Sequence, residues 1–219
     1  MHTLKPLGDS ALLITFGDEI NLRINQRVHA LAALLDSAPL AGITETVPAY
    51  ATLLVHYDPL TLTYAQVAGW IGGQIDWTEF ALTRKPRLVE VPTRYGGASG
   101  SDLEAVAALH NLPVADVIRI HSGREYLVYM MGFTPGFPYM GKLDEAIVTP
   151  RLDTPRTLVK AGTVAIAGAQ TGIYPLDSPG GWRLIGWTPL TLFDPASESP
   201  FLFAPGDTVR FVPIEGNDA

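Results

Sequence analysis

Apolar residues recur every three or four positions in two stretches of the first third of the chain, which predicts two amphipathic helices. Asn21 is placed to cap the first helix and Thr63 the second. Their apolar faces are Ile24, Val28, Leu31 and Leu35 in the first, and Tyr64, Val67, Ile71 and Ile75 in the second. Strand-like runs at 11–16, 44–47 and 52–57 complete a β-α-β-β-α order, which favours a small α/β sandwich with helices on one side of a sheet.

The pattern breaks at residues 82–87, LTRKPR, where charge and proline interrupt the apolar positions. We therefore expect an N-terminal α+β domain over residues 1–85 and a second domain over 86–219. A strand at 88–91 opens the second domain. Ser101 and Glu104 then form a predicted capping box for a short helix that ends at Asn111. Pro113 suits the first turn of another helix, which should stop by Gly123.

Beyond Glu125 no helical period survives. Strand-like runs at 126–133, 163–166, 190–193 and 209–212 alternate with segments rich in glycine and proline. Aromatic residues are interleaved through these segments, which predicts ordered, packed loops with buried rings rather than linkers. They are Phe133, Phe137, Tyr139, Tyr174, Trp182 and Trp187. The fold class that follows is α+β, with a β-barrel-like second domain whose long loops are typical places for function.

Charge and composition exclude several function classes. The net charge of −7 shows no basic footprint for nucleic acid, so the helix pair at 102–121, which resembles a helix-turn-helix, is expected to pack on the barrel. There is no cysteine, hence no disulfide or thiolate metal site, and no metal-ligand motif occurs. The start lacks a signal-peptide pattern and no stretch is long enough to span a bilayer, so we expect a cytoplasmic protein without membrane contact.

Candidate chemistry is sparse outside the glycine-rich loops. His121 ends the second helix in HSGREY, where Glu125 could orient it as a catalytic group; a structural role is the alternative. Arg151, Arg156 and Lys160 lie within ten residues beside one acid, Asp153, which suits either an anion site or a solvated face. Both arginines follow a proline, which favours positioned groups. No P-loop, GxGxxG, HExxH or GxSxG occurs, so no ATP site is visible in this chain.

Long specific motifs resemble one known family. HSGREYLVYMMGFTPGFPYMG at 121–141, the run from Thr149 to Pro195 that contains QTGIYPLDSPGGW, and PGDTVRFVPI at 205–214 are similar to the B-subunit family of bacterial 5-oxoprolinase. That family includes the Kip inhibitor of a sporulation histidine kinase and resembles the subunit-1 part of allophanate hydrolase and urea carboxylase proteins. The chain departs from the family pattern at Leu152, Lys160 and Ala169.

The resemblance implies a cyclophilin-like β-barrel behind the smaller domain, and a role as the B-subunit of an ATP-dependent enzyme that opens 5-oxo-L-proline to L-glutamate. The implied partners are the 5-oxoprolinase C-subunit, a second cyclophilin-like protein, and the A-subunit. ATP would be used by the assembled complex. Two alternatives stay open: an inhibitor that binds a sensor histidine kinase, and a component of a urea carboxylase or allophanate system.

In this view the stretch GAQTGIYPLDSPGGW, at 168–182, lines a small-molecule site. Its glycines let the backbone approach a ligand, and its polar side chains surround an apolar floor that includes Trp182. The expected substrate-binding residues are Arg151, Arg156, Gln170, Thr171, Tyr174, Ser178 and Trp182. The same stretch could instead hold the barrel loops together or face the C-subunit.

Overall fold

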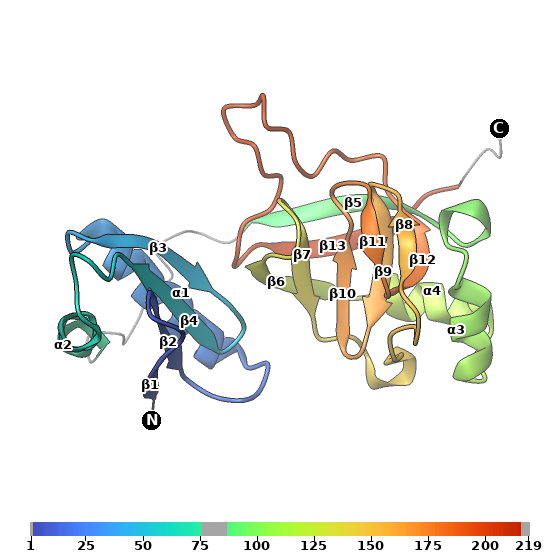
Figure 1. Cartoon of the computed structure of the whole chain (residues 1–219). Coiled ribbons are helices and arrows are strands. Elements are labelled where there is room, and N and C mark those ends of the chain that lie inside the picture. The colour runs from blue at the N-terminus through green and yellow to red at the C-terminus, as the bar shows by residue number, and fades with distance from the viewer. Residues whose placement is uncertain (1, 76–86, 216–219) are drawn as a thin grey trace. The chain divides into compact units, whose positions relative to one another are not determined.

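The computed structural model describes residues 2–75 and 87–215 (Figure 1). Contacts divide the chain into two compact units, residues 1–85 and 86–219, and each is described by itself. The expected boundary at 82–87 lies, apart from Arg87, outside the described residues. Among the described residues, no helix has the length and apolar character that a membrane span requires.

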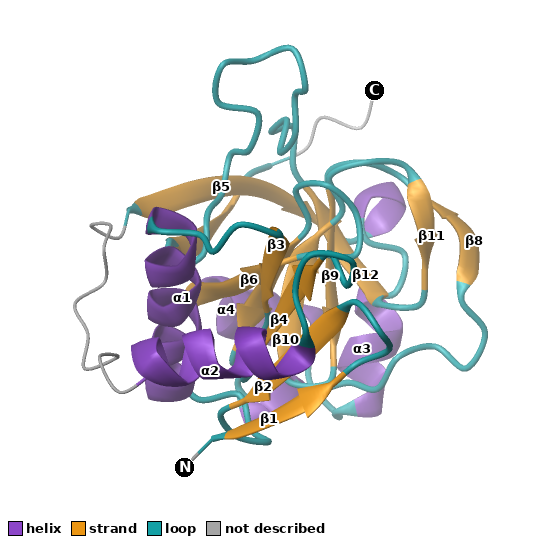
Figure 2. Ribbon diagram, turned by 60° about the vertical axis from the view of Figure 1, so that its left-hand side comes forward, coloured by secondary structure: helices purple, strands orange, loops and turns teal. Residues whose placement is uncertain are grey.

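The N-terminal unit is a four-stranded antiparallel sheet in the order β1-β2-β4-β3, with two helices on one face (Figure 2). The strands are β1 (Thr3–Pro6), β2 (Ala11–Thr15), β3 (Ile43–Pro48) and β4 (Thr52–Tyr57). The helices are α1 (Leu22–Ser37) and α2 (Tyr64–Ile75). The sequence pattern does not predict the first strand, TLKP, because it has four residues of which two are polar; pairing with β2 holds it in the sheet.

Local hydrogen bonds confirm both predicted helix caps. The Asn21 side chain accepts the N–H groups of Arg23 and Ile24, at 2.9 and 3.4 Å. Thr63 and Gln66 form a reciprocal capping box: the Gln66 N–H donates to the Thr63 hydroxyl at 3.4 Å, and the Thr63 N–H donates to the Gln66 side chain at 2.8 Å. The buried apolar faces of the two helices then pack on the sheet as their spacing predicts.

The C-terminal unit is a closed seven-stranded barrel in the order β10-β7-β6-β13-β5-β12-β9. Its strands are β5 (Leu88–Tyr95), β6 (Glu125–Met131), β7 (Pro138–Gly141), β9 (Thr163–Ala167), β10 (Gln170–Ile173), β12 (Arg183–Trp187) and β13 (Thr208–Pro213). Only the β5–β13 pair is parallel among these ladders. The interior is filled by apolar side chains such as Val128, Ile166 and Phe211, so the barrel is a packed core. The expected α+β fold with a barrel domain is confirmed.

Smaller elements cover the barrel. The helices are α3 (Leu103–Leu109) and α4 (Val114–Ser122), with two 3₁₀ turns, η1 (Gly97–Ser99) and η2 (Glu145–Ile147). A separate two-stranded ladder joins β8 (Arg156–Val159) to β11 (Ser178–Gly180), seen beside the barrel in Figure 2. Asn111 follows α3 with a φ of 53°, as expected for a residue that ends a helix.

Three local expectations were wrong. The capping box of Ser101 and Glu104 does not form, because the N-cap of α3 is Asp102 and its carboxylate is bonded elsewhere. Residues 190–193 form no strand; only an isolated bridge joins Phe193 to Phe201. Phe133, expected to be buried, is 60% exposed.

Candidate functional site

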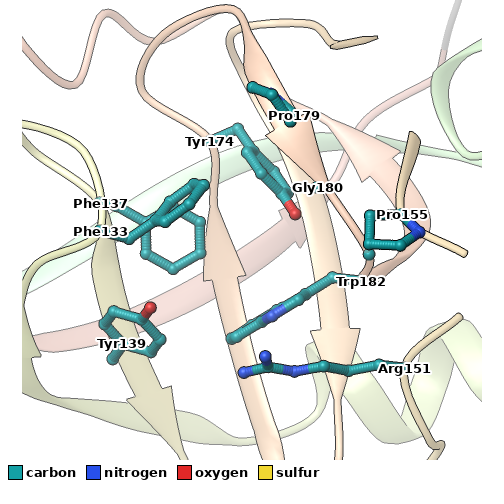
Figure 3. Close-up of a pocket in the computed structure, with 10 residues that line it drawn as sticks. Phe133, Phe137, Tyr139, Arg151, Pro155, Tyr174, Pro179, Gly180 and Trp182 are labelled. Atoms are coloured by element: carbon teal, nitrogen blue, oxygen red, sulfur yellow. The ribbon is translucent and has the colours of Figure 1, made fainter. Parts of the chain in front are cut away.

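The barrel unit carries a cavity of about 230 Å³ whose walls are largely aromatic (Figure 3). Segments far apart in the sequence meet there: the β6–β7 loop, the chain before β8, and the chain from the end of β10 to the start of β12. The aromatic members are Phe133, Phe137, Tyr139, Tyr174 and Trp182. A cavity of about 150 Å³ can hold benzene, so this one has room for a small ring with a substituent.

Phe137 forms the centre of the aromatic floor. Its ring centroid lies 4.9 Å from that of Tyr139, 5.2 Å from Tyr174 and 5.4 Å from Trp182. Tilted and edge-to-face contacts of this kind add to the stability that burial supplies. The floor is therefore held together by contacts between its rings as well as by burial.

Two glycines let these rings pack against the backbone. A Cβ on Gly180 would lie 2.2 Å from the Tyr174 hydroxyl oxygen, and a Cβ on Gly172 would lie 2.8 Å from the Phe137 ring. Both distances are too short for real atoms, so the glycines in TGIYPLDSPGG allow a close ring-to-backbone approach.

Among the described residues that line the cavity, Arg151 is the charged one. Its guanidinium carbon lies 5.8 Å from the Trp182 ring centroid, and Figure 3 shows the two side chains lying side by side. The backbone around it is tethered: the Leu152 N–H donates to the Gly181 carbonyl at 2.8 Å, and the Arg183 side chain donates to the Pro150 carbonyl at 3.3 Å. None of the ion pairs formed by the described residues involves Arg151.

Two tyrosines of the cavity lining lie within electrostatic reach of this cation. Burial raises the pKa of Tyr139 and of Tyr174 above the ordinary tyrosine value. The positive charge of Arg151 partly opposes the rise in the pKa of Tyr139. For the pKa of Tyr174, a hydrogen bond with the Trp182 backbone opposes the rise more than Arg151 does. Both hydroxyls are therefore neutral at physiological pH and can donate hydrogen bonds. The cavity combines an apolar ring-sized floor, a cation that no described carboxylate neutralises and two neutral hydroxyls, which suits a small cyclic monoanion.

Arg156, the other expected anion-binding arginine, is used differently. Its guanidinium donates to the Asp102 carboxylate at 2.6 Å, and Asp102 in turn accepts the Leu184 N–H at 2.7 Å. A further contact at 3.4 Å reaches the Trp182 carbonyl. Arg156 thus ties β8 to the start of α3 and to β12, and it is not part of the cavity lining.

His121 and Thr171 lie inside the barrel. The hydroxyl of Thr171 donates to the Ala165 carbonyl at 3.1 Å, so it must accept from Nε2–H of His121 at 2.9 Å. Nδ1 of His121 then accepts from the Tyr95 hydroxyl at 2.7 Å. Burial lowers the pKa of His121 to about 3, which keeps the ring neutral. The structure does not bring this histidine to the cavity.

The two other expected binding residues also lie outside the lining. Gln170 is half-buried at the start of β10, between β7 and β9. Ser178 is buried on β11, and its hydroxyl is without a hydrogen-bond partner among the described residues. Of the seven expected substrate-binding residues, the structure gathers Arg151, Tyr174 and Trp182 in one cavity.

Sequence reasoning missed the aromatic half of the site. Phe133, Phe137 and Tyr139 were recognised as packed aromatics but not as site residues. The available signal was GFTPGFPY, where aromatics alternate with turn residues at the end of a barrel strand. Within residues 2–75 and 87–215, no three histidine, aspartate or glutamate side chains gather in a metal-binding cluster.

Comparison with known proteins agrees with the sequence motifs. Residues 2–203 match the family model described as "Carboxyltransferase domain, subdomain C and D". The chain is 42% identical to the 5-oxoprolinase B-subunit of Bacillus subtilis, over 99% of this chain and 95% of that protein.

Two solved structures share the fold. The protein TTHA0988 is 40% identical, with a TM-score of 0.82 over 95% of this chain. The urea amidolyase of K. lactis has a TM-score of 0.83 over 97% of this chain at 20% identity, which shows the fold alone. Both are longer proteins: this chain spans 41% of the first and 15% of the second.

Proposed function

The chain belongs to the B-subunit family of 5-oxoprolinases, and we propose that it serves as the B-subunit of an ATP-dependent 5-oxoprolinase that opens 5-oxo-L-proline to L-glutamate. The A-subunit and the C-subunit would complete the enzyme. The observation that carries the proposal is the aromatic cavity with Arg151 at its side, because 5-oxoproline is a small ring with one carboxylate and a neutral amide.

The substrate chemistry matches the lining group by group. The carboxylate would pair with the Arg151 guanidinium, which offers two parallel N–H donors. The ring would lie over Phe137 and against Trp182 on one side. The polar lactam edge would then meet the hydroxyls of Tyr139 and Tyr174, of which the first is half-buried and the second buried.

Ring opening breaks the bond between the carbonyl carbon and the ring nitrogen, and water supplies the hydroxyl group and the proton that the products need. The lactam resists this because amide resonance makes the nitrogen a poor leaving group. The residues of this chain would bind the ring, orient it and keep bulk water away. Neutral phenols could also stabilise negative charge that develops on the carbonyl oxygen.

ATP does not fit the cavity. Pockets for larger ligands occupy roughly 300–1,000 Å³, whereas this one has about 230 Å³ and one cation among its described lining residues. The sequence contains no P-loop or GxGxxG motif, and the glycine-rich loop at 96–100, which precedes α3, does not line this cavity. We therefore place nucleotide use outside this cavity, and expect the isolated chain to form no glutamate.

Purified chain, alone and mixed with the purified A-subunit and C-subunit, should be assayed for ATP-dependent glutamate formation from 5-oxoproline. Arg151→Gln should raise KM by roughly tenfold to a hundredfold, as loss of a charged hydrogen bond does. Arg119→Gln is the matched control, since Arg119 is an exposed arginine of the same unit that pairs with Asp116. Activity of the chain alone, or an Arg151→Gln enzyme with unchanged KM, would contradict the proposal.

The sequence left two alternatives. The structural similarity to urea amidolyase, at 20% identity, concerns the fold alone. It therefore does not support the alternative that this chain is part of a urea carboxylase system. Inhibition of a histidine kinase stays a prediction, which a direct binding measurement with a purified kinase would test.

A further inference from the structure

Phe133 is an exposed aromatic residue at the edge of the cavity. Its side chain is 60% exposed, although its ring centroid lies 5.6 Å from Phe137 and 6.4 Å from Tyr174, both edge to face. Figure 3 shows Phe133 and Phe137 together on one side of the cavity, with Trp182 and Arg151 reaching in from the other. Among the described aromatic residues of the lining, Phe133 is thus the exposed one.

The backbone of Phe133 is strained. Its φ is 66°, a region that residues with a bulky side chain rarely adopt. The Thr134 N–H donates to the Gly132 carbonyl at 2.8 Å, which closes a three-residue turn around Phe133. This is the rare, strained form of the γ-turn. The Phe137 N–H bond to the Thr134 carbonyl, at 3.0 Å, holds the same loop in place.

The backbone conformation alone gives no reason for a phenylalanine here. Glycine adopts positive φ at no steric cost, and the same loop uses glycine for this purpose at Gly136, where φ is 86°. An exposed ring contributes little to the core. Strain that is maintained at the edge of a cavity is a pointer to function when an actual outlier is observed.

We propose that Phe133 is a specificity-determining residue whose ring closes over the substrate ring from the side opposite Trp182. The inference rests on the proposed function of the cavity. With the ring of 5-oxoproline held between Phe133 and Trp182, water would be excluded from the Arg151–carboxylate pair, and the pair would be stronger in the drier site. The strained turn fixes the distance between the two walls, and hence the size of ring that fits.

Phe133→Gly and Phe133→Ala separate the ring from the strain. Both remove the ring, but only glycine relieves the backbone. Calorimetry with the assembled complex, or with the chain if it binds alone, should show the Kd for 5-oxoproline raised about tenfold in both variants. The melting temperature of Phe133→Gly should equal or exceed that of the wild type and that of Phe133→Ala. Phe133→Tyr should bind within about twofold of the wild type.

The control is Phe201→Ala. Phe201 is a comparably exposed ring of the same unit, 47% exposed and stacked on Phe193, but it does not line the cavity. Its loss should leave the Kd unchanged. A second probe is 6-oxopiperidine-2-carboxylate, the ring-expanded lactam. The wild type should reject it by at least about tenfold relative to 5-oxoproline, as a pocket does for one extra methylene, and Phe133→Ala should reject it less.

The outcomes are distinct. If the wild type, Phe133→Ala and Phe133→Gly all bind 5-oxoproline equally well, this inference is overturned and the proposed function stands. A fall in melting temperature for Phe133→Gly assigns the ring to the fold and also overturns it. A wild type that binds no 5-oxoproline, alone or assembled, overturns both proposals.

Discussion

Replacing Arg156 by alanine should destabilise the barrel unit without weakening ligand binding. The Arg156 guanidinium lies 2.6 Å from the Asp102 carboxylate, and the two side chains are 29% and 11% exposed. The variant leaves the Asp102 carboxylate largely buried with one remaining donor, the Leu184 N–H at 2.7 Å. The cost therefore comes from an uncompensated buried charge as well as from a lost contact.

The magnitude follows from the burial of the pair. Loss of a charged hydrogen bond costs about 1.5–3 kcal/mol, and breaking a fully buried pair costs about 3–5 kcal/mol. Because Arg156 is partly exposed, we expect about 2 kcal/mol. For a chain of this size, that corresponds to a fall of about 4–8 °C in melting temperature.

A double-mutant cycle makes the assay specific. Unfolding in urea should be measured for Arg156→Ala, Asp102→Ala and the double variant. The double variant should be less destabilised than the sum of the two single variants, by about 1–2 kcal/mol, because the second substitution removes the orphaned charge. Arg119→Ala breaks an ion pair whose Arg119 and Asp116 side chains are 71% and 39% exposed. Its free energy of unfolding should therefore stay within about 0.5 kcal/mol of the wild-type value.

The reasoning is refuted if Arg156→Ala has the same melting temperature as the wild type, or if the losses in free energy of unfolding caused by the Arg156 and Asp102 substitutions are additive. An Arg156→Ala variant with unchanged stability and a raised Kd for 5-oxoproline would return Arg156 to the binding site, where the sequence first placed it.

Two further predictions concern the barrel interior and the cavity floor. Because the pKa of His121 is lowered to about 3 in the fold and is about 6.5 in the unfolded chain, protons bind the unfolded state first as pH falls below 6.5. The contribution of the neutral His121 to the free energy of unfolding is therefore present above pH 6.5 and declines from there towards pH 3. Urea unfolding at pH 7.5 and at pH 5.5 should show that the wild type loses about 1.4 kcal/mol through this group, a loss that should be missing in His121→Leu. Equal losses in the wild type and in His121→Leu would contradict the burial argument. Gly180→Ala should lower the free energy of unfolding by about 1–3 kcal/mol and weaken ligand binding, because its Cβ would lie 2.2 Å from the Tyr174 hydroxyl. Gly69→Ala is the control, because a Cβ at this position of α2 would lie in open space. Equal stability of the two variants would contradict the close packing around Gly180.

The sequence by itself determined the features that depend on neighbouring residues. The caps at Asn21 and Thr63 were predictable because each involves partners within three residues. The apolar faces of α1 and α2 were predictable because helical periodicity is local. The motifs around 121–141 and 168–182 also identified the family, and they correctly drew attention to the region that forms the cavity.

Only the tertiary structure decided which of the expected residues share a site. Arg151 and Arg156 each follow a proline and look alike in sequence, but Asp102, 54 residues before Arg156, pairs with that arginine and leaves Arg151 beside the cavity. His121 lies next to the family motifs in sequence, but barrel closure places it between Tyr95 and Thr171, 26 and 50 residues away, so its expected catalytic role stays a prediction.

The short strands were missed for the same reason. β10 and β11 read as glycine-rich loop, because what makes them strands is pairing with β7, β9 and β8. Long-range pairing is encoded jointly by distant segments, and no local pattern within either segment reveals its partner. The aromatic wall of the cavity, Phe133 included, is assembled by the same barrel closure.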